Sequence, residues 1–494
     1  MDRKLVLLNP PYERIAPGYD FVRHVTNRSP SLGLLHLAGE VRKHGWNPIL
    51  LEADQQGLDA EGCARRIVEH RPRYLGITLF TVGVAAAVEV SRRVRQQLPG
   101  IRIIIGGPHV ASMGLETLER HPEFDVAVLG EGEQALVELL QAWEDGKDLR
   151  QVPGLCVRDQ DRLQQTGPRV NPKVLDEFAD PAWDLLDDFP SGFNGAIFDF
   201  PRGPVATLAA SRGCPFLCRF CDTSTFGATV RAFSPPRVFQ WMKRLHQEYG
   251  IRHIQFVDDL FLASRRRATE LCHLLVEAKL PLTWSCAARV DTVHPDLLAL
   301  MRKAGCWEIS FGLESGSNAL LQQMDKSARV ERSEQAIRWT AQAGIRSKGL
   351  FMLGYPGETP ETMEQTRQFV RRLPLSMMNL TKFTPYPGSP IYQDLFGTRI
   401  REQDWPRMNG MNFLWTPENL DAKTLDRWYR KILSSFYRQP RVNLHLARIG
   451  FRNPSHFIRL GRFLRAYLRF RWQKKRSSAP PSHRPQSLYQ KAAS

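Results

Sequence analysis

The hydrophobic positions of the first 145 residues fall in short apolar runs separated by longer amphipathic stretches. The runs predict strands at residues 5–8, 49–52, 74–80, 101–105 and 124–129, and the stretches predict helices at 32–44, 60–70, 82–98 and 133–143. Residues 103–105 and 126–128 are apolar without alternation, which is typical of strands buried on both faces. This order predicts a doubly wound, Rossmann-like α/β domain over residues 1–150, with ligands bound at the carboxyl ends of its strands.

A second series of strands and helices begins at residue 201. Strands are predicted at residues 205–210, 253–257, 282–287, 307–311, 347–353 and 378–383. Six β/α units predict a partial (β/α)6 barrel of the TIM type over residues 201–395, in which chemistry gathers at the carboxyl ends of the strands. Residues 151–204 contain seven prolines and few periodic stretches. Residues 151–200 are therefore predicted to be a linker that lays the first domain over the barrel mouth.

The C-terminal region, residues 396–475, is predicted to be helical and basic, with helices at residues 421–437 and 455–472. In the second helix Arg459, Arg462, Arg465 and Arg469 recur at three- and four-residue steps among aromatic and aliphatic residues. A basic amphipathic helix is typical of elements that bind a membrane surface or a partner protein. The alternative is an ordinary helix that packs on the barrel. Residues 476–494 are polar and rich in Pro and Ser, and are predicted to be disordered.

The composition of the 494-residue chain, 42% hydrophobic and 24% charged, is that of a globular protein with more than one domain. No apolar run approaches the roughly 18–20 residues that span a bilayer, and the short run at residues 5–8 is no signal-peptide core. A cytoplasmic protein is therefore expected. The net charge of +17 comes mostly from the C-terminus, where residues 441–476 hold eleven Lys or Arg and no Asp or Glu. The sequence does not favour nucleic acid as a partner.

Three of the eight cysteines, Cys214, Cys218 and Cys221, form a C-x3-C-x2-C cluster. Three thiolates on one loop can bind three irons of a cubane cluster and leave the fourth iron open. A structural zinc site would need four ligands, usually in two pairs, and the sequence has no second pair. The cluster therefore favours an iron–sulfur site, and the single cysteines Cys272, Cys286 and Cys306 are expected in the core.

Glycine-rich turns follow the fourth and fifth predicted strands of the first domain. Glycine lets a backbone approach a bulky ligand closely, although it also simply permits a tight turn. The candidate ligand-binding residues of these turns are Gly106, Gly107, His109, Gly130, Glu131 and Gly132.

These turns and cysteines, together with the runs FGLESGS (311–317), FMLGYPGET (351–359) and TPYPGSP (384–390), resemble one enzyme family over residues 1 to about 400. It is the radical S-adenosylmethionine (SAM) enzymes with an N-terminal cobalamin-binding domain, whose members include methylases, a tetrapyrrole cyclase and rearrangement enzymes. The resemblance implies a [4Fe–4S] cluster on the three cysteines, SAM on the open iron, and cobalamin at the glycine-rich turns. One signature is missing. The residues 9–31 lack the Asp-x-His-x-x-Gly motif, and the string at 20–24 has the wrong spacing. No histidine of that kind is therefore expected on cobalt, and a domain that has lost cobalamin is the alternative.

The ends of the predicted barrel strands carry residues to which the resemblance gives a role at SAM. Asp258 or Asp259 would accept hydrogen bonds from its ammonium group, and Arg289 would pair with its carboxylate. Glu314 and Ser315 would hold the ribose or the methionine portion. The alternative is that the carboxylates among them cap the helices that follow the strands.

The function expected from the resemblance is methyl transfer to an unactivated carbon of a small-molecule or lipid-like substrate through a 5′-deoxyadenosyl radical. An external reductant such as flavodoxin or ferredoxin would supply electrons. The basic C-terminal helix extends this expectation to a peripheral contact with the inner face of the membrane, where a lipid or pigment would be found. An oxidative cyclase or rearrangement enzyme without methyl transfer is the alternative. A tRNA-modifying enzyme is a third hypothesis, weakened because no RNA-binding module follows the barrel.

Overall fold

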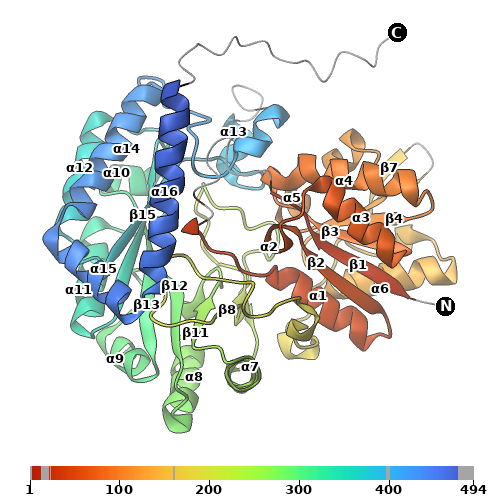
Figure 1. Cartoon of the computed structure of the whole chain (residues 1–494), viewed down its shortest axis with the longest axis horizontal. Helices are drawn as coiled ribbons and strands as arrows, with labels where there is room; N and C mark the ends of the chain where they lie inside the picture. The colour runs from red at the N-terminus through yellow and green to blue at the C-terminus, as the bar shows by residue number, and fades with distance from the viewer. Residues whose placement is uncertain (1–2, 13–21, 23, 160–161, 396–400, 477–494) are drawn as a thin grey trace.

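The computed structural model describes residues 3–12, 22, 24–159, 162–395 and 401–476, which form two lobes side by side (Figure 1). The first lobe is built on a seven-stranded sheet of order β2-β1-β3-β4-β5-β6-β7. Its parallel strands are β1 (Lys4–Asn9), β2 (Asn47–Glu52), β3 (Tyr74–Thr78), β4 (Arg102–Gly106) and β5 (Val126–Val128). Strands β6 (Leu155–Asp159) and β7 (Arg162–Gln165) add an antiparallel hairpin at the edge.

Helices cover both faces of this sheet. One face packs against α1 (Leu32–Lys43) and α6 (Glu133–Asp145), and the other against α3 (Ala60–His70), α4 (Val84–Gln97) and α5 (Pro108–Arg120). The short helix α2 (Ala53–Gln56) follows β2. The chain changes direction across the sheet between β1 and β3. In a doubly wound fold such a switch point opens a crevice at the carboxyl ends of the strands.

The second lobe contains six parallel strands in chain order, which curve into a partial barrel. They are β8 (Val205–Leu208), β11 (His253–Phe256), β12 (Thr283–Ala288), β13 (Cys306–Glu314), β14 (Arg346–Leu353) and β15 (Met377–Lys382). The helices between them are α7 (Pro235–Tyr249), α8 (Arg265–Ala278), α9 (Pro295–Lys303), α10 (Asn318–Gln323), α11 (Val330–Gln342) and α12 (Pro360–Arg372). Local signals set their starts: the hydroxyl of Ser234 accepts from Arg237 N at 3.4 Å, and Pro235 occupies the first turn of α7.

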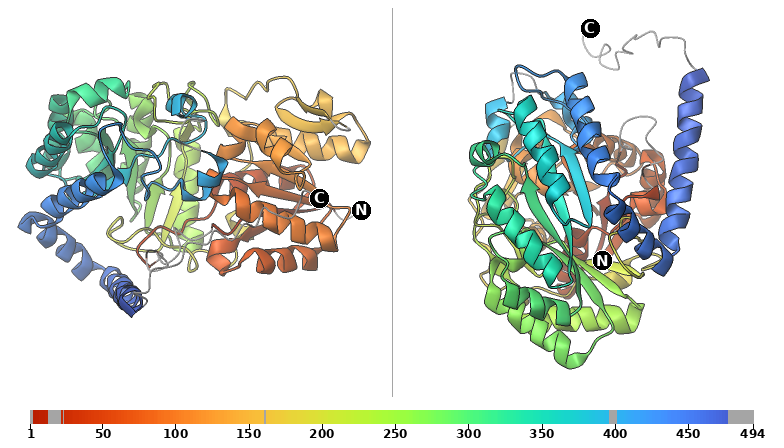
Figure 2. Two further views of the ribbon diagram at one scale, coloured as in Figure 1. Left: turned by 90° about the horizontal axis from the view of Figure 1, so that it is seen from above. Right: turned by 90° about the vertical axis from the view of Figure 1, so that its left-hand side faces the viewer.

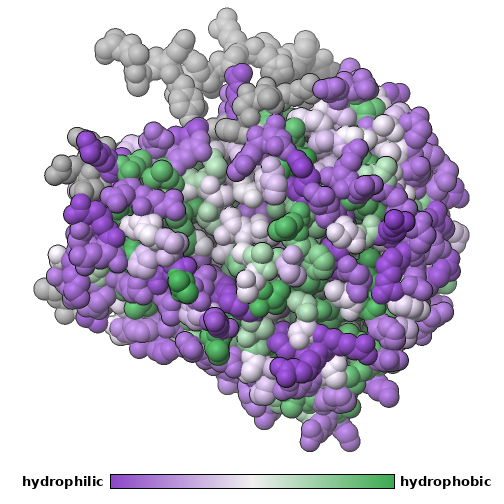
Figure 3. All heavy atoms as spheres, turned by 180° about the vertical axis from the view of Figure 1, so that it is seen from behind, coloured by the Kyte–Doolittle hydropathy of each residue, from purple (hydrophilic) through white to green (hydrophobic). Residues whose placement is uncertain are grey.

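The chain beyond the barrel returns to the first lobe before it runs over the second. It forms α13 (Pro390–Leu395), the 3-10 segment η7 (Glu402–Arg407), α14 (Ala422–Tyr437), α15 (Pro440–Arg452) and α16 (Ser455–Arg476). In η7 the buried ring of Trp405 packs edge-on against His109 of the first lobe, with 4.7 Å between ring centroids. Helix α16 runs along the outside of the molecule (Figure 2). On the face opposite to that of Figure 1, hydrophobic residues gather toward the middle of the molecule and hydrophilic residues dominate its ends (Figure 3).

The architecture is the one predicted, with differences at its margins. Every predicted strand and helix is present, most with ends within two residues of the prediction. Helix α5 was not predicted, because Gly107 and Pro108 at its start read as a turn. Strands β6 and β7 also lie beyond the expected boundary at residue 150, so the first part of the expected linker belongs to the first sheet. The predicted tail at 476–494 lies outside the described residues, apart from Arg476.

Candidate functional site

The cysteine loop is a long excursion from the end of β8 with a narrow neck. The neck is a two-stranded antiparallel ribbon of β9 (Ser211–Arg212) and β10 (Arg231–Ala232), and all three cysteines lie between these strands. Cys218 is buried, Cys214 is half-buried and Cys221 is exposed, and none of the three is in a disulfide. The loop therefore presents three free thiols at the carboxyl end of the barrel.

Two carboxylates that follow β11 fix the start of this loop. Asp258 accepts from the backbone N–H of Ala210 at 3.0 Å and from the hydroxyl of Ser211 at 2.5 Å, while Asp259 accepts from the backbone N–H of Gly213 at 2.9 Å. Burial raises the pKa of Asp258 to about 6, and these hydrogen bonds oppose the rise. The structure thus gives both side chains protein partners in the cysteine loop, and the contact of one of them with the ammonium group of SAM stays a prediction.

Two cations, Lys326 and Arg289, lie near Cys218. Burial raises the pKa of this thiol, and Lys326 and Arg289 lower it. Nη1 of Arg289 lies 4.0 Å from the sulfur of Cys218, and its guanidinium stacks 3.5 Å from the centroid of the Phe216 ring. The remaining nitrogens of Arg289 donate to Asp291 and to the backbone oxygen of Lys326. Nη1 is therefore the part of Arg289 that faces the cysteine loop.

Glu314 ends β13 in a left-handed backbone conformation, with φ of +56°. Its carboxylate accepts from Nζ of Lys326 at 2.7 Å, and both side chains are largely buried. Burial lowers the pKa of Lys326, but Glu314 and Cys218 raise it, and the pKa lies above its ordinary value. Sequence reasoning missed Lys326, which follows a short helix and belongs to no motif. Its only sequence signal is a position twelve residues after Glu314.

Ser315 and Glu358 are engaged by neighbouring protein groups. The hydroxyl of Ser315 lies 3.2 Å from that of Thr366 and accepts from the backbone N–H of Ser317. Glu358 accepts from the hydroxyl of Thr362 at 2.6 Å at the start of α12, and burial raises its pKa to about 7. Ser315 was expected at SAM, but in the structure it joins the end of β13 to α12.

The glycine-rich turn after β4 is shaped by its own protein neighbours. Gly107 has φ of +98°, and a Cβ there would lie 2.7 Å from the hydroxyl of Thr78, so only glycine fits. His109 is buried, and its ring nitrogens lie 3.1 Å from the hydroxyls of Thr81 and Thr117. Burial lowers the pKa of His109 to about 3. His109 is thus a neutral, enclosed residue, and the turn reaches the sheet edge with backbone from Gly106 and Gly107.

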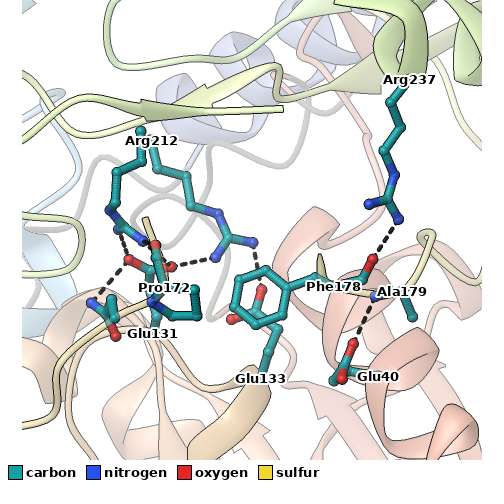
Figure 4. Close-up of polar contacts among 10 residues, drawn as sticks. Glu40, Glu131, Glu133, Pro172, Phe178, Ala179, Arg212 and Arg237 are labelled. Carbon is teal, nitrogen blue, oxygen red and sulfur yellow. Dashed lines mark hydrogen bonds and ion pairs between the residues drawn. The ribbon is translucent and has the colours of Figure 1, made fainter. Parts of the chain in front are cut away.

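The turn after β5 contacts the cysteine loop directly. A Cβ on Gly130 would lie 3.4 Å from the backbone oxygen of Thr225, and one on Gly132 would lie 3.0 Å from the side chain of Leu37. Glu131 is buried and accepts from Arg212 and Arg231, the two arginines of the loop's neck (Figure 4). The structure therefore uses Glu131, expected at cobalamin, to join the two lobes.

The edge of the first sheet also carries residues that the sequence analysis did not single out. Tyr12 donates to the side-chain oxygen of Asn9 and packs edge-on against Phe80, whose side chain is exposed at the end of β3. The amide of Asn9 donates to Glu52, and burial raises the pKa of that carboxyl to about 7. The exposed ring of Phe80, beside the glycine-rich turns, forms a surface on which a flat macrocycle can stack. The string at residues 20–24 lies largely outside the described residues.

The residues present fit an iron–sulfur cluster better than a single metal ion. In the described part of the chain, no three His, Cys, Asp or Glu side chains are close enough together to hold one ion. A cubane cluster does not require its ligands to be so close together, because each cysteine binds a different iron and the sulfurs lie farther apart. Three free thiols on one loop, with two cations beside Cys218, meet that requirement.

Comparison with known sequences identifies both lobes. Residues 208–370 match the radical SAM superfamily, and residues 19–140 match the B12 binding domain. The chain is 29% identical over 441 residues to an uncharacterized methyltransferase of Pyrococcus horikoshii, covering 89% of this chain and 93% of that protein. It is 28% identical to the anaerobic magnesium-protoporphyrin IX monomethyl ester cyclase of Cereibacter sphaeroides (79% and 64% covered) and 26% identical to the hopanoid C-3 methylase of Methylococcus capsulatus (73% and 68%).

Solved structures share the fold across both lobes. The radical SAM methyltransferase TsrM from Kitasatospora setae superposes with a TM-score of 0.66 at 18% identity, covering 87% of this chain and 83% of TsrM. The cobalamin-dependent radical SAM enzyme OxsB with aqua-cobalamin gives 0.65 at 18% identity, covering 85% and 58%. The chain belongs to the radical SAM enzymes that carry an N-terminal B12-binding domain. Its cofactors are a [4Fe–4S] cluster, SAM and cobalamin.

Proposed function

We propose that this enzyme transfers a methyl group to an unactivated carbon of a small-molecule substrate. One observation carries the proposal: the neck of the cysteine loop is bonded to the turn that ends β5 of the B12-binding lobe. This contact supports an arrangement in which the two proposed cofactor sites adjoin across the joint between the lobes. A methyl donor and a radical generator that act on one carbon must both lie within reach of it, which this arrangement supports.

The protein side of this chemistry is assigned as follows. When bound, the cluster and SAM supply a radical by reductive cleavage of a carbon–sulfur bond, and cobalamin supplies a transferable methyl group. Cys214, Cys218 and Cys221 hold three irons, and Nη1 of Arg289 pairs with the carboxylate of SAM. The Lys326–Glu314 pair keeps its charges beside Cys218 in a fixed geometry. Asp258 and Asp259 act indirectly on the cluster, because they fix the backbone of the cysteine loop.

Cobalamin is proposed to lie along the carboxyl edge of the first sheet, over the backbone of Gly106, Gly107, Gly130 and Gly132 and beside Phe80. Glycine backbones leave no side chain between the sheet edge and a large ligand. An oxidative cyclase is the second candidate, because the cyclase of Cereibacter sphaeroides is as similar to this chain as the methylases are. That cyclase and this chain differ in span, since the match covers 64% of the cyclase.

Product analysis separates the two candidates. Anaerobically reconstituted enzyme, given a reductant such as flavodoxin or ferredoxin, is incubated with SAM and an extract of cells that lack the gene. A methyltransferase forms S-adenosylhomocysteine and 5′-deoxyadenosine together. It needs cobalamin to form both the methylated product and S-adenosylhomocysteine. Formation of 5′-deoxyadenosine alone, at the same yield without cobalamin, would favour the cyclase.

We further propose that α16 holds the enzyme at an anionic membrane surface, where a lipid or pigment substrate is found. The start of α16 is anchored by side chains of two residues, His456 and Arg459. His456 accepts from the backbone N–H of Phe198 at 3.2 Å and donates to the backbone oxygen of Phe200 at 2.9 Å. Arg459 donates to backbone oxygens of Thr26 and Gly195. Beyond this anchor the helix stands beside the body of the protein (Figure 2).

The part of α16 beyond this anchor has both apolar and basic side chains that are exposed. Leu464 and Leu468 are 47% and 61% exposed, and Arg462, Arg465 and Arg469 are also exposed. Each basic residue near an anionic leaflet contributes about 1 kcal/mol, so these arginines supply about 3 kcal/mol. That corresponds to roughly a hundredfold in partitioning. No helix within the described residues is long and apolar enough to cross a membrane. The contact proposed is therefore peripheral.

Vesicle co-sedimentation tests the contact. Full-length protein should pellet with vesicles that contain phosphatidylglycerol and stay in the supernatant with phosphatidylcholine alone. The variant Leu464→Ser/Leu468→Ser keeps the anchor at His456 and Arg459 and should lose most of the binding. The matched control changes Leu444, an exposed leucine of α15, to serine and should bind normally. Equal sedimentation of all three proteins would refute the membrane role of α16.

A further inference from the structure

The joint between the lobes contains a buried cluster of four charges, which we call the latch: Glu131, Glu133, Arg212 and Arg231. Nη1 of Arg212 donates to Glu131 and Nη2 donates to Glu133, each at 2.5 Å, while Arg231 donates to the other oxygen of Glu131 (Figure 4). All four side chains are less than 10% exposed. Two carboxylates and two guanidinium groups balance, so the cluster is buried without net charge.

The position of the latch in the chain is what makes it informative. Arg212 lies two residues before Cys214, and Arg231 follows Cys221 by ten residues. The two arginines face each other across the β9–β10 ribbon. Like charges placed opposite each other on adjacent strands repel, so the ribbon alone is a poor place for two arginines. The carboxylates of the first lobe remove that penalty, and the neck of the cysteine loop closes on them.

Segments from both lobes and from the connector pack around the latch. The guanidinium of Arg212 lies 5.5 Å from the ring of Phe178 and 5.4 Å from that of Phe226. Phe178 belongs to the connector between the lobes, where the next backbone N–H, that of Ala179, donates to Glu40 of α1 at 2.6 Å. Arg237 of α7 donates to the backbone oxygen of Phe178 (Figure 4). The first lobe, the connector and the barrel therefore meet around Arg212.

We propose that the latch is a positioning device, with Arg212 as its central positioning residue, that sets the separation between the cysteine loop and the cobalamin edge of the first lobe. The inference rests on the proposed function, since it concerns how two cofactors act on one substrate. A planar guanidinium that bonds two carboxylates at once fixes direction as well as distance. Because the arginines bracket all three cysteines, a shift of the β5 turn moves the whole loop.

The test replaces the latch without leaving a buried charge. The double variant Arg212→Met/Glu133→Leu keeps the Glu131–Arg231 pair, and exchanging a buried ion pair for apolar side chains of similar size preserves folding. The matched control is Glu308→Leu/Arg346→Met, which removes a pair of equal burial, 3.1 Å apart, near the amino ends of β13 and β14. Both variants are reconstituted as holoenzymes with cluster, SAM and cobalamin.

The readout is the dipolar coupling between the spins of cob(II)alamin and the reduced cluster, measured by pulsed electron paramagnetic resonance. Wild-type enzyme and the control should give the same narrow distance distribution, and the latch variant a broader or displaced one. Cleavage of SAM to 5′-deoxyadenosine without substrate should stay within about twofold of wild type in the latch variant. Coupled methyl transfer should fall by about 100-fold, since a misplacement of about 1 Å has that effect.

Each other result counts against the latch. An unchanged distribution in the latch variant, or equal broadening in the control, would overturn the proposal. If the double variant loses its cluster, Arg212→Lys serves as the second variant, because lysine cannot bond both carboxylates through one planar group. Loss of the cluster in that variant as well would make the latch a requirement for folding of the loop and overturn its positioning role. Absence of methyl transfer in wild type, with narrow coupling, would instead defeat the proposed function alone.

Discussion

Replacing Lys326 by methionine tests how the charges beside the cysteine loop are held. The lysine donates to Glu314 at 2.7 Å, and the two side chains are 9% and 11% exposed. Methionine matches the length of the lysine stem but leaves the carboxylate of Glu314 buried without its partner. Removing one member of a buried pair costs about 3–5 kcal/mol. The free energy of unfolding should fall by that amount, measured by urea denaturation of the anaerobic protein.

The double variant Lys326→Met/Glu314→Leu is the matched control for that result. It removes both charges, and a neutral exchange of a buried pair has little effect on stability. Leucine at position 314 meets the same left-handed backbone as the native glutamate, so backbone strain does not change. The double variant should regain most of the lost stability yet fail to cleave SAM. A loss below about 1 kcal/mol in the single variant, or equal losses in both, would refute the coupling of these charges.

Three further predictions concern the cofactors and one buried acid. Alanine in place of Cys214, Cys218 or Cys221 should abolish 5′-deoxyadenosine formation and lower the iron content from about four per chain, by iron analysis, while circular dichroism stays unchanged; full SAM cleavage in such a variant would contradict the cluster assignment. The cob(II)alamin spectrum should lack splitting from a protein imidazole nitrogen, because residues 9–31 hold no Asp-x-His-x-x-Gly motif; such splitting would show a histidine on cobalt. Burial raises the pKa of Glu358 from 4.5 to about 7, so this carboxyl binds its proton more tightly in the folded state, and its contribution to stability falls as pH rises from about 4.5 to 7. Glu358→Gln should therefore raise the free energy of unfolding by up to about 3 kcal/mol at pH 8 and change it little at pH 4.5. An equal effect at both pH values would show that the effect does not come from the titration of Glu358.

The fold was predictable because its signals are local. Apolar runs such as residues 103–105 identify strands buried on both faces, and Asp421 and Ser455 mark the starts of α14 and α16 within a residue. The C-x3-C-x2-C spacing likewise needs only one short segment. The sequence also placed Asp258, Arg289 and Glu314 correctly at the carboxyl ends of strands, because a strand and its end can be read from the same run.

The partners of those side chains were not predictable from local patterns. Arg212 and Glu131 are 81 residues apart, and their pairing depends on how the lobes are oriented, which periodicity does not contain. Asp258 or Asp259 was expected at SAM, and the backbone N–H of Ala210 from which Asp258 accepts lies just after the neighbouring strand β8. His109 was predicted to be a ligand-binding residue, but in the structure Trp405 of the distant segment η7 packs against its ring.

The proposed enzyme uses a SAM-derived radical and cobalamin in one active site to transfer a methyl group. The most direct test supplies the reconstituted enzyme with SAM that carries a trideuterated methyl group, in an extract of cells lacking the gene. The product should gain the trideuterated methyl group, should form only when cobalamin is bound, and should be accompanied by equal amounts of S-adenosylhomocysteine and 5′-deoxyadenosine. Products that contain no deuterium, or the same yield from enzyme without cobalamin, would contradict the proposed methyl transfer.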